Sequence, residues 1–256
     1  MHDMAELNYA KFGTGNRKLV IIPGLSMTKV TDNPAALGKT FEIFGKEWTV
    51  YLIDRPDKVP EGWTNEDLSE YVVSIMESLG IDKADIAGMS QGGMIAQHIA
   101  VNHPEMVHAL VLGATLSAMN DYAKEVISNW IDLAREEKYY EHNMDSFSRL
   151  YTDEYFSSKH IDKSAIAKVL LPWDKDWYIH LAQACLSGGP HSRIKEIECP
   201  TFVLGARNDM VLTGKASEDI ADALGCRLHM FEKYRHAFYD EAPDYYSRVY
   251  DFLSTL

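Results

Sequence analysis

The sequence predicts an α/β protein with a mostly parallel sheet, helices on both faces of that sheet, and a helical insertion. Short apolar runs rich in β-branched residues alternate with longer amphipathic stretches along most of the 256 residues. Unbroken apolar runs are typical of strands buried on both faces, and strands that alternate with helices form an α/β sheet. The alternation stops between about residues 117 and 190, which predicts that a helical segment interrupts the sheet domain.

Six apolar runs are predicted to be the parallel strands. They are residues 19–22, 49–53, 86–89, 107–112, 201–204 and 228–231. Most are followed at once by a glycine or a polar residue, where a strand gives way to a loop. Residues 7–12 instead alternate in polarity and precede Gly13-Thr14-Gly15-Asn16. That pattern predicts an antiparallel edge strand and a turn.

Amphipathic stretches between these runs predict the helices that cover the sheet. They are residues 64–79, 91–102, 214–224 and 243–253, with one more after Asn33-Pro34. The first opens with Thr64-Asn65-Glu66-Asp67, which has the form of a capping box, and stops at Gly80.

The interrupting segment is unusually aromatic. Residues 121–180 hold 11 of the 28 aromatic side chains. Two interpretations are open: an extra helical core, or a helical cap that lines an apolar pocket. We predict the cap, with residues 1–116 and 191–256 as the core domain and residues 117–190 as the insertion. Gly188-Gly189-Pro190 is the predicted return hinge.

Composition excludes several classes of function. The chain has 25 basic and 38 acidic side chains and a formal net charge of −13, which argues against binding to nucleic acid or to anionic lipid. The three cysteines are scattered, so neither a disulfide framework nor a cysteine zinc site is predicted. Met1 to Glu6 has no signal-peptide pattern, and no apolar run is long enough to span a membrane. These features predict a cytoplasmic protein, and they leave both a monomer and a homodimer open.

One serine stands in a pattern that carries chemistry. Gly88-Met89-Ser90-Gln91-Gly92 has the form G-x-S-x-G and lies between a predicted strand and a predicted helix. A sharp turn at that place lifts the serine oxygen above the sheet, and the small glycines allow the turn to pack closely. Ser90 is therefore the candidate nucleophile. The alternative is a glycine-rich turn with an incidental serine.

A nucleophilic serine needs a base and a carboxylate that orients the base. Of the ten histidines, His236 follows the last predicted strand, and Asp209 follows the strand before it. The carboxyl ends of parallel strands face the site in such sheets, so these two are the candidate base and acid. Asp121 is the rival for the acid. Glu241 is expected to cap a helix. No histidine spacing predicts a metal site.

The sequence resembles the α/β-hydrolase superfamily over about residues 1–115 and 195–256. The resemblance rests on the elbow with Gly92-Gly93, on Cys199-Pro200-Thr201, on the run from His236 to Pro243, and on the order Ser90, Asp209, His236. It implies the α/β-hydrolase fold, a Ser-His-Asp triad, and an oxyanion hole made by the N–H groups of Leu25 and Gln91. Serine at the elbow argues against the dehalogenases and epoxide hydrolases of this fold, which carry aspartate there.

Two loops depart from the common pattern of this superfamily. Pro23-Gly24 stands where relatives usually carry His-Gly. Asp54-Arg55-Pro56-Asp57-Lys58 stands where they often carry a glycine-bearing turn. The second departure predicts that this loop takes another path beside the site.

The predicted function is that of a serine hydrolase that cleaves a small uncharged carboxylic ester or related acyl compound without a cofactor or metal. Met89, Trp130, Trp173 and Trp177 are the candidate substrate-binding residues, because aromatic and methionine side chains make an apolar, adaptable pocket. Alternatives are a proline-iminopeptidase-like peptidase, a thioesterase, a lactonase and a cofactor-free haloperoxidase. A small-molecule receptor on the same fold is the alternative from another class.

Overall fold

The computed structural model describes residues 8–32 and 34–256. The prediction about a signal peptide at Met1 to Glu6 and the predicted lead into a helix at Asn33 lie outside the described residues.

Strands join in one sheet, in the order β1-β3-β2-β4-β5-β6-β7. They are β1 Tyr9–Phe12, β2 Arg17–Ile22, β3 Trp48–Ile53, β4 Ala84–Met89, β5 Val107–Gly113, β6 Thr201–Ala206 and β7 Arg227–Phe231.

The sheet is parallel except at one edge. β1 pairs antiparallel with β3, and all the other neighbours pair parallel. Every residue of β3, β4 and β6 is buried, because helices cover both faces of these central strands. The predicted α/β class, the parallel strands and the antiparallel edge strand are thus confirmed.

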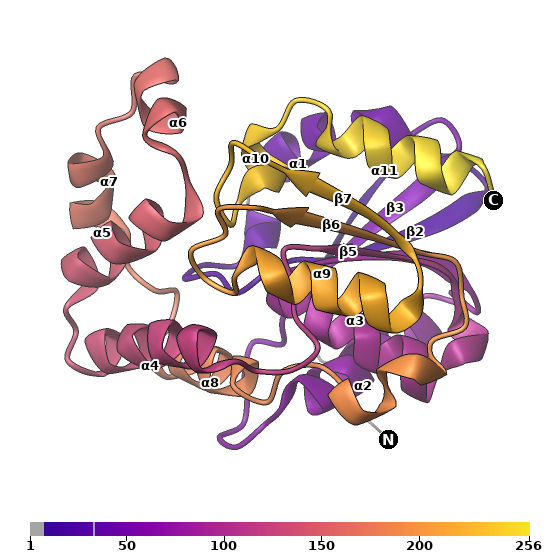
Figure 1. Ribbon diagram of the computed structural model, residues 1–256, viewed down its shortest axis with the longest axis horizontal. Helices are drawn as coiled ribbons and strands as arrows, with labels where there is room; N and C mark the ends of the chain where they lie inside the picture. Colours follow the sequence, from indigo (N-terminus) through magenta and orange to yellow (C-terminus); the bar gives the residue numbers. More distant parts are fainter. Residues whose placement is uncertain (1–7, 33) are drawn as a thin grey trace.

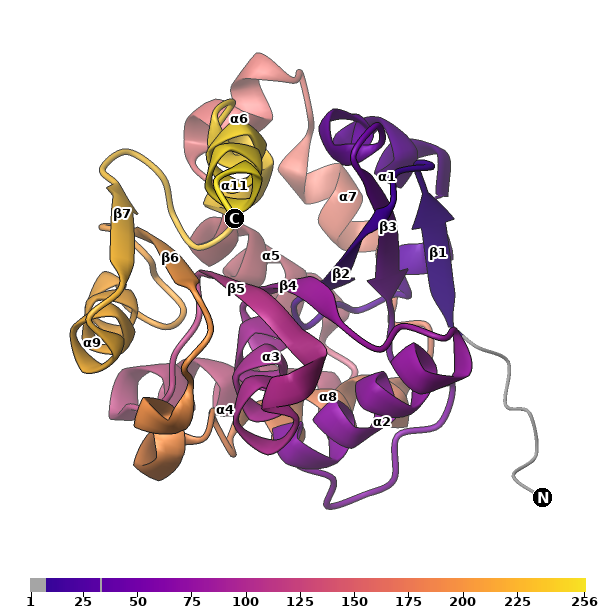
Figure 2. The ribbon, with the colours of Figure 1, turned by 90° about the vertical axis from the view of Figure 1, so that its right-hand side faces the viewer.

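Helices pack on both faces, as Figure 2 shows. One face carries α2 Asn65–Ser78, α3 Gln91–Asn102 and α9 Gly214–Leu224, and the other carries α1 Pro34–Thr40 and α11 Tyr245–Ser254. The short α10 Phe238–Glu241 was not predicted. Short 3₁₀ segments lie at Val30–Asp32, Glu42–Phe44, Pro104–Met106 and His191–Glu196. The predicted capping box is present, because the Thr64 and Asp67 side chains bond each other's backbone N–H groups.

A set of helices replaces the alternation between β5 and β6. They are α4 Asp121–Arg135, α5 Tyr139–Leu150, α6 Asp153–Ser158, α7 Lys163–Val169 and α8 Lys175–Cys185. Figure 1 shows them beyond the ends to which the arrows of β6 and β7 point. The two ends of this segment meet, since the N–H of Gly189 donates to the carbonyl of Ser117 at 2.9 Å.

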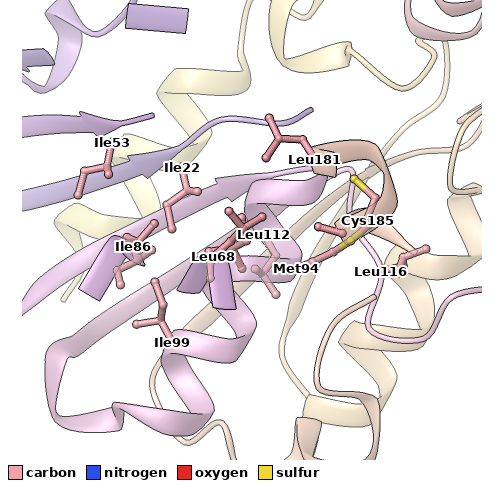
Figure 3. Packing of buried hydrophobic residues seen from close by; sticks show 14 of the residues in the cluster. Ile22, Ile53, Leu68, Ile86, Met94, Ile99, Leu112, Leu116, Leu181 and Cys185 are labelled. Carbon is pink, nitrogen blue, oxygen red and sulfur yellow. The ribbon is translucent and has the colours of Figure 1, made fainter. Parts of the chain in front are cut away.

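The helical segment shares its core with the sheet domain. Leu181 and Cys185 of α8 lie in the same buried cluster as Met94 of α3 and Leu116, as Figure 3 shows. A second buried cluster fills the opposite face of the sheet, against α11. In the part of the chain that the structure describes, no helix is long and apolar enough to cross a membrane.

Candidate active site

Ser90 sits on a strained turn between β4 and α3. Its backbone has φ 53° and ψ −120°, a region that a residue with a side chain adopts only when its surroundings force it. The turn is held tightly. The Ser90 N–H donates to the carbonyl of Gly113 at 2.8 Å, and a Cβ on Gly92 would come within 2.0 Å of the Ile22 carbonyl oxygen. Glycine at 92 is therefore required for this turn.

Three side chains form a continuous hydrogen-bonded chain at this turn. His236 Nε2 lies 2.9 Å from Ser90 Oγ, and His236 Nδ1 lies 2.8 Å from Asp209 Oδ2. Asp209 and His236 are both buried, whereas Asp121, the rival for the acid, is exposed in the first turn of α4. The structure therefore brings together Ser90, His236 and Asp209, and it leaves Asp121 outside.

The surroundings of Asp209 keep its carboxylate charged. Burial acts to raise the pKa of Asp209, but the His236 ring and the N–H groups of Leu212 and Val211 outweigh it and hold that pKa below its ordinary value. These two N–H groups donate to Oδ1 at 2.9 and 2.8 Å. An ionised Asp209 accepts a hydrogen bond from the N–H of His236 Nδ1, which leaves Nε2 as an acceptor for the Ser90 hydroxyl.

The residues of the predicted oxyanion hole lie at this site. Gln91 is the first residue of α3, where backbone N–H groups have no partner within the helix. The loop that carries Leu25 passes close to the serine, since a Cβ on Gly24 would lie 3.1 Å from Ser90 Cβ. Leu25 and Ser90 line one cavity.

Arg55 supports this loop, a role that sequence reasoning missed. It is 2% exposed, and its Nη2 donates to the carbonyl of Pro23 at 2.7 Å. Among the described residues, its Nε and Nη1 have no hydrogen-bond partner. In the sequence, the loop that contains Arg55, residues 54–58, stood out only as a departure from the family pattern. A charged side chain two residues after a buried strand was the available signal.

A cavity of about 220 Å³ opens at Ser90 and His236. Its walls come from the loop after β2, from the helical segment and from the loop that carries Asp209. Residues of the helical segment that line it include Ile127, Trp130, His142, Asn143, Ser146, Phe147, Leu150, Tyr151, Leu170, Tyr178 and Cys185. No Asp, Glu, Lys or Arg is among the lining residues that the structure describes. Burial raises the pKa of the Cys185 thiol to about 12, so this thiol is protonated and is no rival nucleophile.

One of the four predicted substrate-binding residues lines this cavity, and three do not. Trp130 does. Met89 packs in the cluster on the opposite face of the sheet, because neighbouring residues of a strand point to opposite sides. Trp173 is 45% exposed beside Lys29. Trp177 is buried, and its Nε1 donates to the carbonyl of Pro56 at 2.8 Å. Its indole joins α8 to the loop after β3 instead of facing the cavity.

The prediction that Glu241 caps the helix after it is wrong, because the N-cap of that helix is Asp244. The Glu241 carboxylate accepts hydrogen bonds from the backbone N–H and the hydroxyl of Thr152, at 3.0 and 2.5 Å. Thr152 is the N-cap of α6. Glu241 therefore connects the loop after His236 to the helical segment.

Comparison with known proteins agrees with this geometry. The sequence pattern of the alpha/beta hydrolase fold family matches residues 19–243. The chain belongs to this family.

Curated relatives match most of the chain at low identity. The human serine hydrolase BPHL is 21% identical, over 97% of this chain and 83% of its own. The pyrrolizixenacetamide deacetylase of Xenorhabdus hominickii is 24% identical, over 84% of this chain and 82% of its own. Among solved structures, the enol-lactonase of Burkholderia xenovorans LB400 superposes with a TM-score of 0.81 at 22% identity, over 96% of this chain and 95% of that one. That likeness shows the fold.

Proposed function

We propose that the protein is a serine hydrolase that cleaves a small uncharged carboxylic ester through an acyl-enzyme. The observation that carries this proposal is the hydrogen-bonded chain from Asp209 through His236 to Ser90. It opens on a cavity whose walls, as far as the chain is described, carry no Asp, Glu, Lys or Arg. Buried, oriented side chains of this kind are what nucleophilic catalysis by serine requires.

In the proposed reaction, Ser90 Oγ attacks the ester carbonyl while His236 Nε2 takes its proton. The N–H groups of Leu25 and Gln91 stabilise the negative charge that develops on the carbonyl oxygen. His236 then gives the proton to the leaving alcohol, and the acyl group stays on Ser90. Water, deprotonated by His236, attacks the acyl-enzyme and releases the acid, which restores the Ser90 hydroxyl. Asp209 holds the imidazole in the tautomer that both halves need.

The helical segment is proposed to be a cap over this site, with residues 117–190 as its bounds. The contact between Ser117 and Gly189 supports these bounds, because it brings the ends of the segment together. Many of the residues that line the cavity come from its helices. A cavity of about 220 Å³ is smaller than the roughly 300–1,000 Å³ of drug-sized ligand sites, which favours a small substrate.

A panel of p-nitrophenyl esters of increasing acyl length, run beside aminoacyl p-nitroanilides, tests the proposal. We expect turnover of short and medium uncharged esters and a steep fall for long acyl chains. If the anilides were cleaved and the esters were not, the peptidase would be favoured instead. Absence of turnover with every compound of the panel, in protein that is folded, would favour the receptor.

A further inference from the structure

Four polar side chains on α5 and α8 line the cavity, and the mechanism above uses none of them. They are His142, Asn143 and Ser146 on α5 and Tyr178 on α8. All four are buried, and Asn143 is 0% exposed. Buried polar groups are ordered by their hydrogen bonds, so the direction of each bond decides what these residues offer a ligand.

The amide of Asn143 has a fixed orientation. Its Nδ2 lies 3.0 Å from the carbonyl of Ala167 and 2.8 Å from that of Leu170. Carbonyl oxygens only accept hydrogen bonds, so the nitrogen of the amide must face them. Asn143 Oδ1 is consequently the atom that meets His142 Nδ1, at 3.2 Å.

This contact determines where the proton of His142 lies. Oδ1 accepts, so Nδ1 must carry the hydrogen. Burial lowers the pKa of His142, which leaves the ring neutral with a bare Nε2. The hydroxyl of Tyr178 lies 2.5 Å from Nε2 and must therefore donate its only hydrogen to that nitrogen.

The hydroxyl oxygens of Tyr178 and Ser146 keep lone pairs but have no hydrogen left to donate. The Tyr178 hydrogen is held by His142, and Ser146 Oγ donates its hydrogen to the carbonyl of Asn143 at 3.1 Å. We propose that Tyr178 and Ser146 form an acceptor subsite that selects substrates bearing a neutral hydrogen-bond donor, a hydroxyl or an amide N–H, in the acyl group. This proposal rests on the proposed function. Neutral donors fit better than an ammonium group because no carboxylate lines the cavity among the described residues.

Matched p-nitrophenyl esters test the subsite in the wild-type enzyme. The hydroxyl-bearing esters are 3-hydroxybutanoate and 6-hydroxyhexanoate. The methyl isosteres are 3-methylbutanoate and heptanoate, and the ketones are 3-oxobutanoate and 6-oxoheptanoate. We expect at least one hydroxyl ester to exceed its methyl isostere and its ketone in kcat/KM by about tenfold, the usual value of one neutral hydrogen bond.

Three variants separate the subsite from general packing. Tyr178→Phe removes the accepting oxygen, so the hydroxyl-to-methyl ratio should fall toward one. His142→Phe keeps a ring in place but frees the Tyr178 hydrogen, so the ketone should gain on the hydroxyl ester. Tyr122→Phe is the control, because the Tyr122 hydroxyl belongs to the same helical segment and donates to the carbonyl of Met210, while Tyr122 is not one of the described residues that line the cavity. It should leave the hydroxyl-to-methyl ratio as in wild type.

Calorimetric binding of the same esters to Ser90→Ala repeats the comparison without turnover. If wild type and Tyr178→Phe were both active and had equal hydroxyl-to-methyl ratios, the subsite would be overturned and the proposed hydrolase activity would stand. If wild type cleaved none of the esters but Ser90→Ala still bound the hydroxyl esters more tightly than their methyl isosteres, the subsite would be supported and the proposed hydrolase activity would be overturned. A preference for ketones in wild type would contradict the assigned direction of the Tyr178 hydrogen bond.

Discussion

The carboxylate of Asp209 and the imidazole of His236 form a buried pair, with Oδ2 and Nδ1 2.8 Å apart. The other carboxylate oxygen is occupied by two backbone N–H groups. Both oxygens of the Asp209 carboxylate are therefore fixed by hydrogen bonds. This holds the imidazole of His236 in one orientation toward Ser90.

Asp209→Asn should lower kcat for ester hydrolysis by about 10³–10⁴, because an amide can hold the wrong tautomer of His236. Stability should change little, since the amide oxygen can still accept the two N–H groups. Asp121→Asn, at an exposed position, is the matched control and should retain nearly full activity. Steady-state kinetics of both variants checks this, and the reverse ranking would move the acid to Asp121.

Arg55→Met should lower kcat by about 10- to 100-fold, because the Pro23 carbonyl loses the donor that holds the oxyanion loop, and small displacements of such groups have large effects. Arg17→Met is the control. Arg17 pairs with Asp85 at the amino end of the sheet, so its loss should change the melting temperature at most. If the two variants had equal kcat, Arg55 would have no positioning role.

Trp130→Leu should shift the selectivity between short and long esters by about 1–3 kcal/mol, the usual scale for pocket contacts. The indole lines the cavity, so its truncation lengthens the space for an acyl chain. Trp173→Leu removes an exposed tryptophan of the same segment and should leave the selectivity unchanged. A selectivity that follows Trp173 and not Trp130 would show that the cavity is not the substrate site.

Asp240→Asn should stabilise the protein above about pH 7 by at most about 1 kcal/mol, because the Asp240 side chain is exposed and solvent screens its charge. Desolvation of the carboxyl raises the pKa of Asp240 to about 6, against the smaller opposite effect of the hydrogen bond from Tyr151. In the unfolded chain this carboxyl has a pKa of about 4, so between about pH 4 and pH 6 the folded state binds more protons than the unfolded state. The free energy of unfolding of the wild-type protein therefore falls as the pH rises through this range.

Urea unfolding of both proteins across this range measures the effect. The free energy of unfolding of Asp240→Asn should exceed that of wild type at about pH 8, and the two should converge at about pH 4. A difference that does not depend on pH would mean that the Asp240 carboxyl titrates normally.

The strands and the residues of the proposed triad could be predicted from the sequence because both leave local signals. A buried strand is a continuous apolar run, and Ser90, Asp209 and His236 each follow such a run. Parallel pairing then brings their loops to one edge of the sheet, whatever the distance in sequence.

The cavity walls were not accessible in the same way. Helical spacing gives the side on which a tryptophan lies but not what that side meets, so Trp130 and Trp177 looked equivalent. The hydrogen bond between His142 of α5 and Tyr178 of α8 joins two residues that are 36 positions apart in the sequence. Arg55 and Glu241 likewise act on segments far along the chain, Pro23 and Thr152, and no local pattern records such contacts.

Hydrolysis of a short p-nitrophenyl ester by Ser90→Ala, measured beside wild type and with folding checked by circular dichroism, is the decisive test of Ser90 as the nucleophile. We predict a fall in kcat of at least about 10³-fold with an unchanged fold, because only the oxyanion hole and binding would remain. A folded variant that kept a tenth of the wild-type turnover would contradict the assignment of Ser90 as the nucleophile.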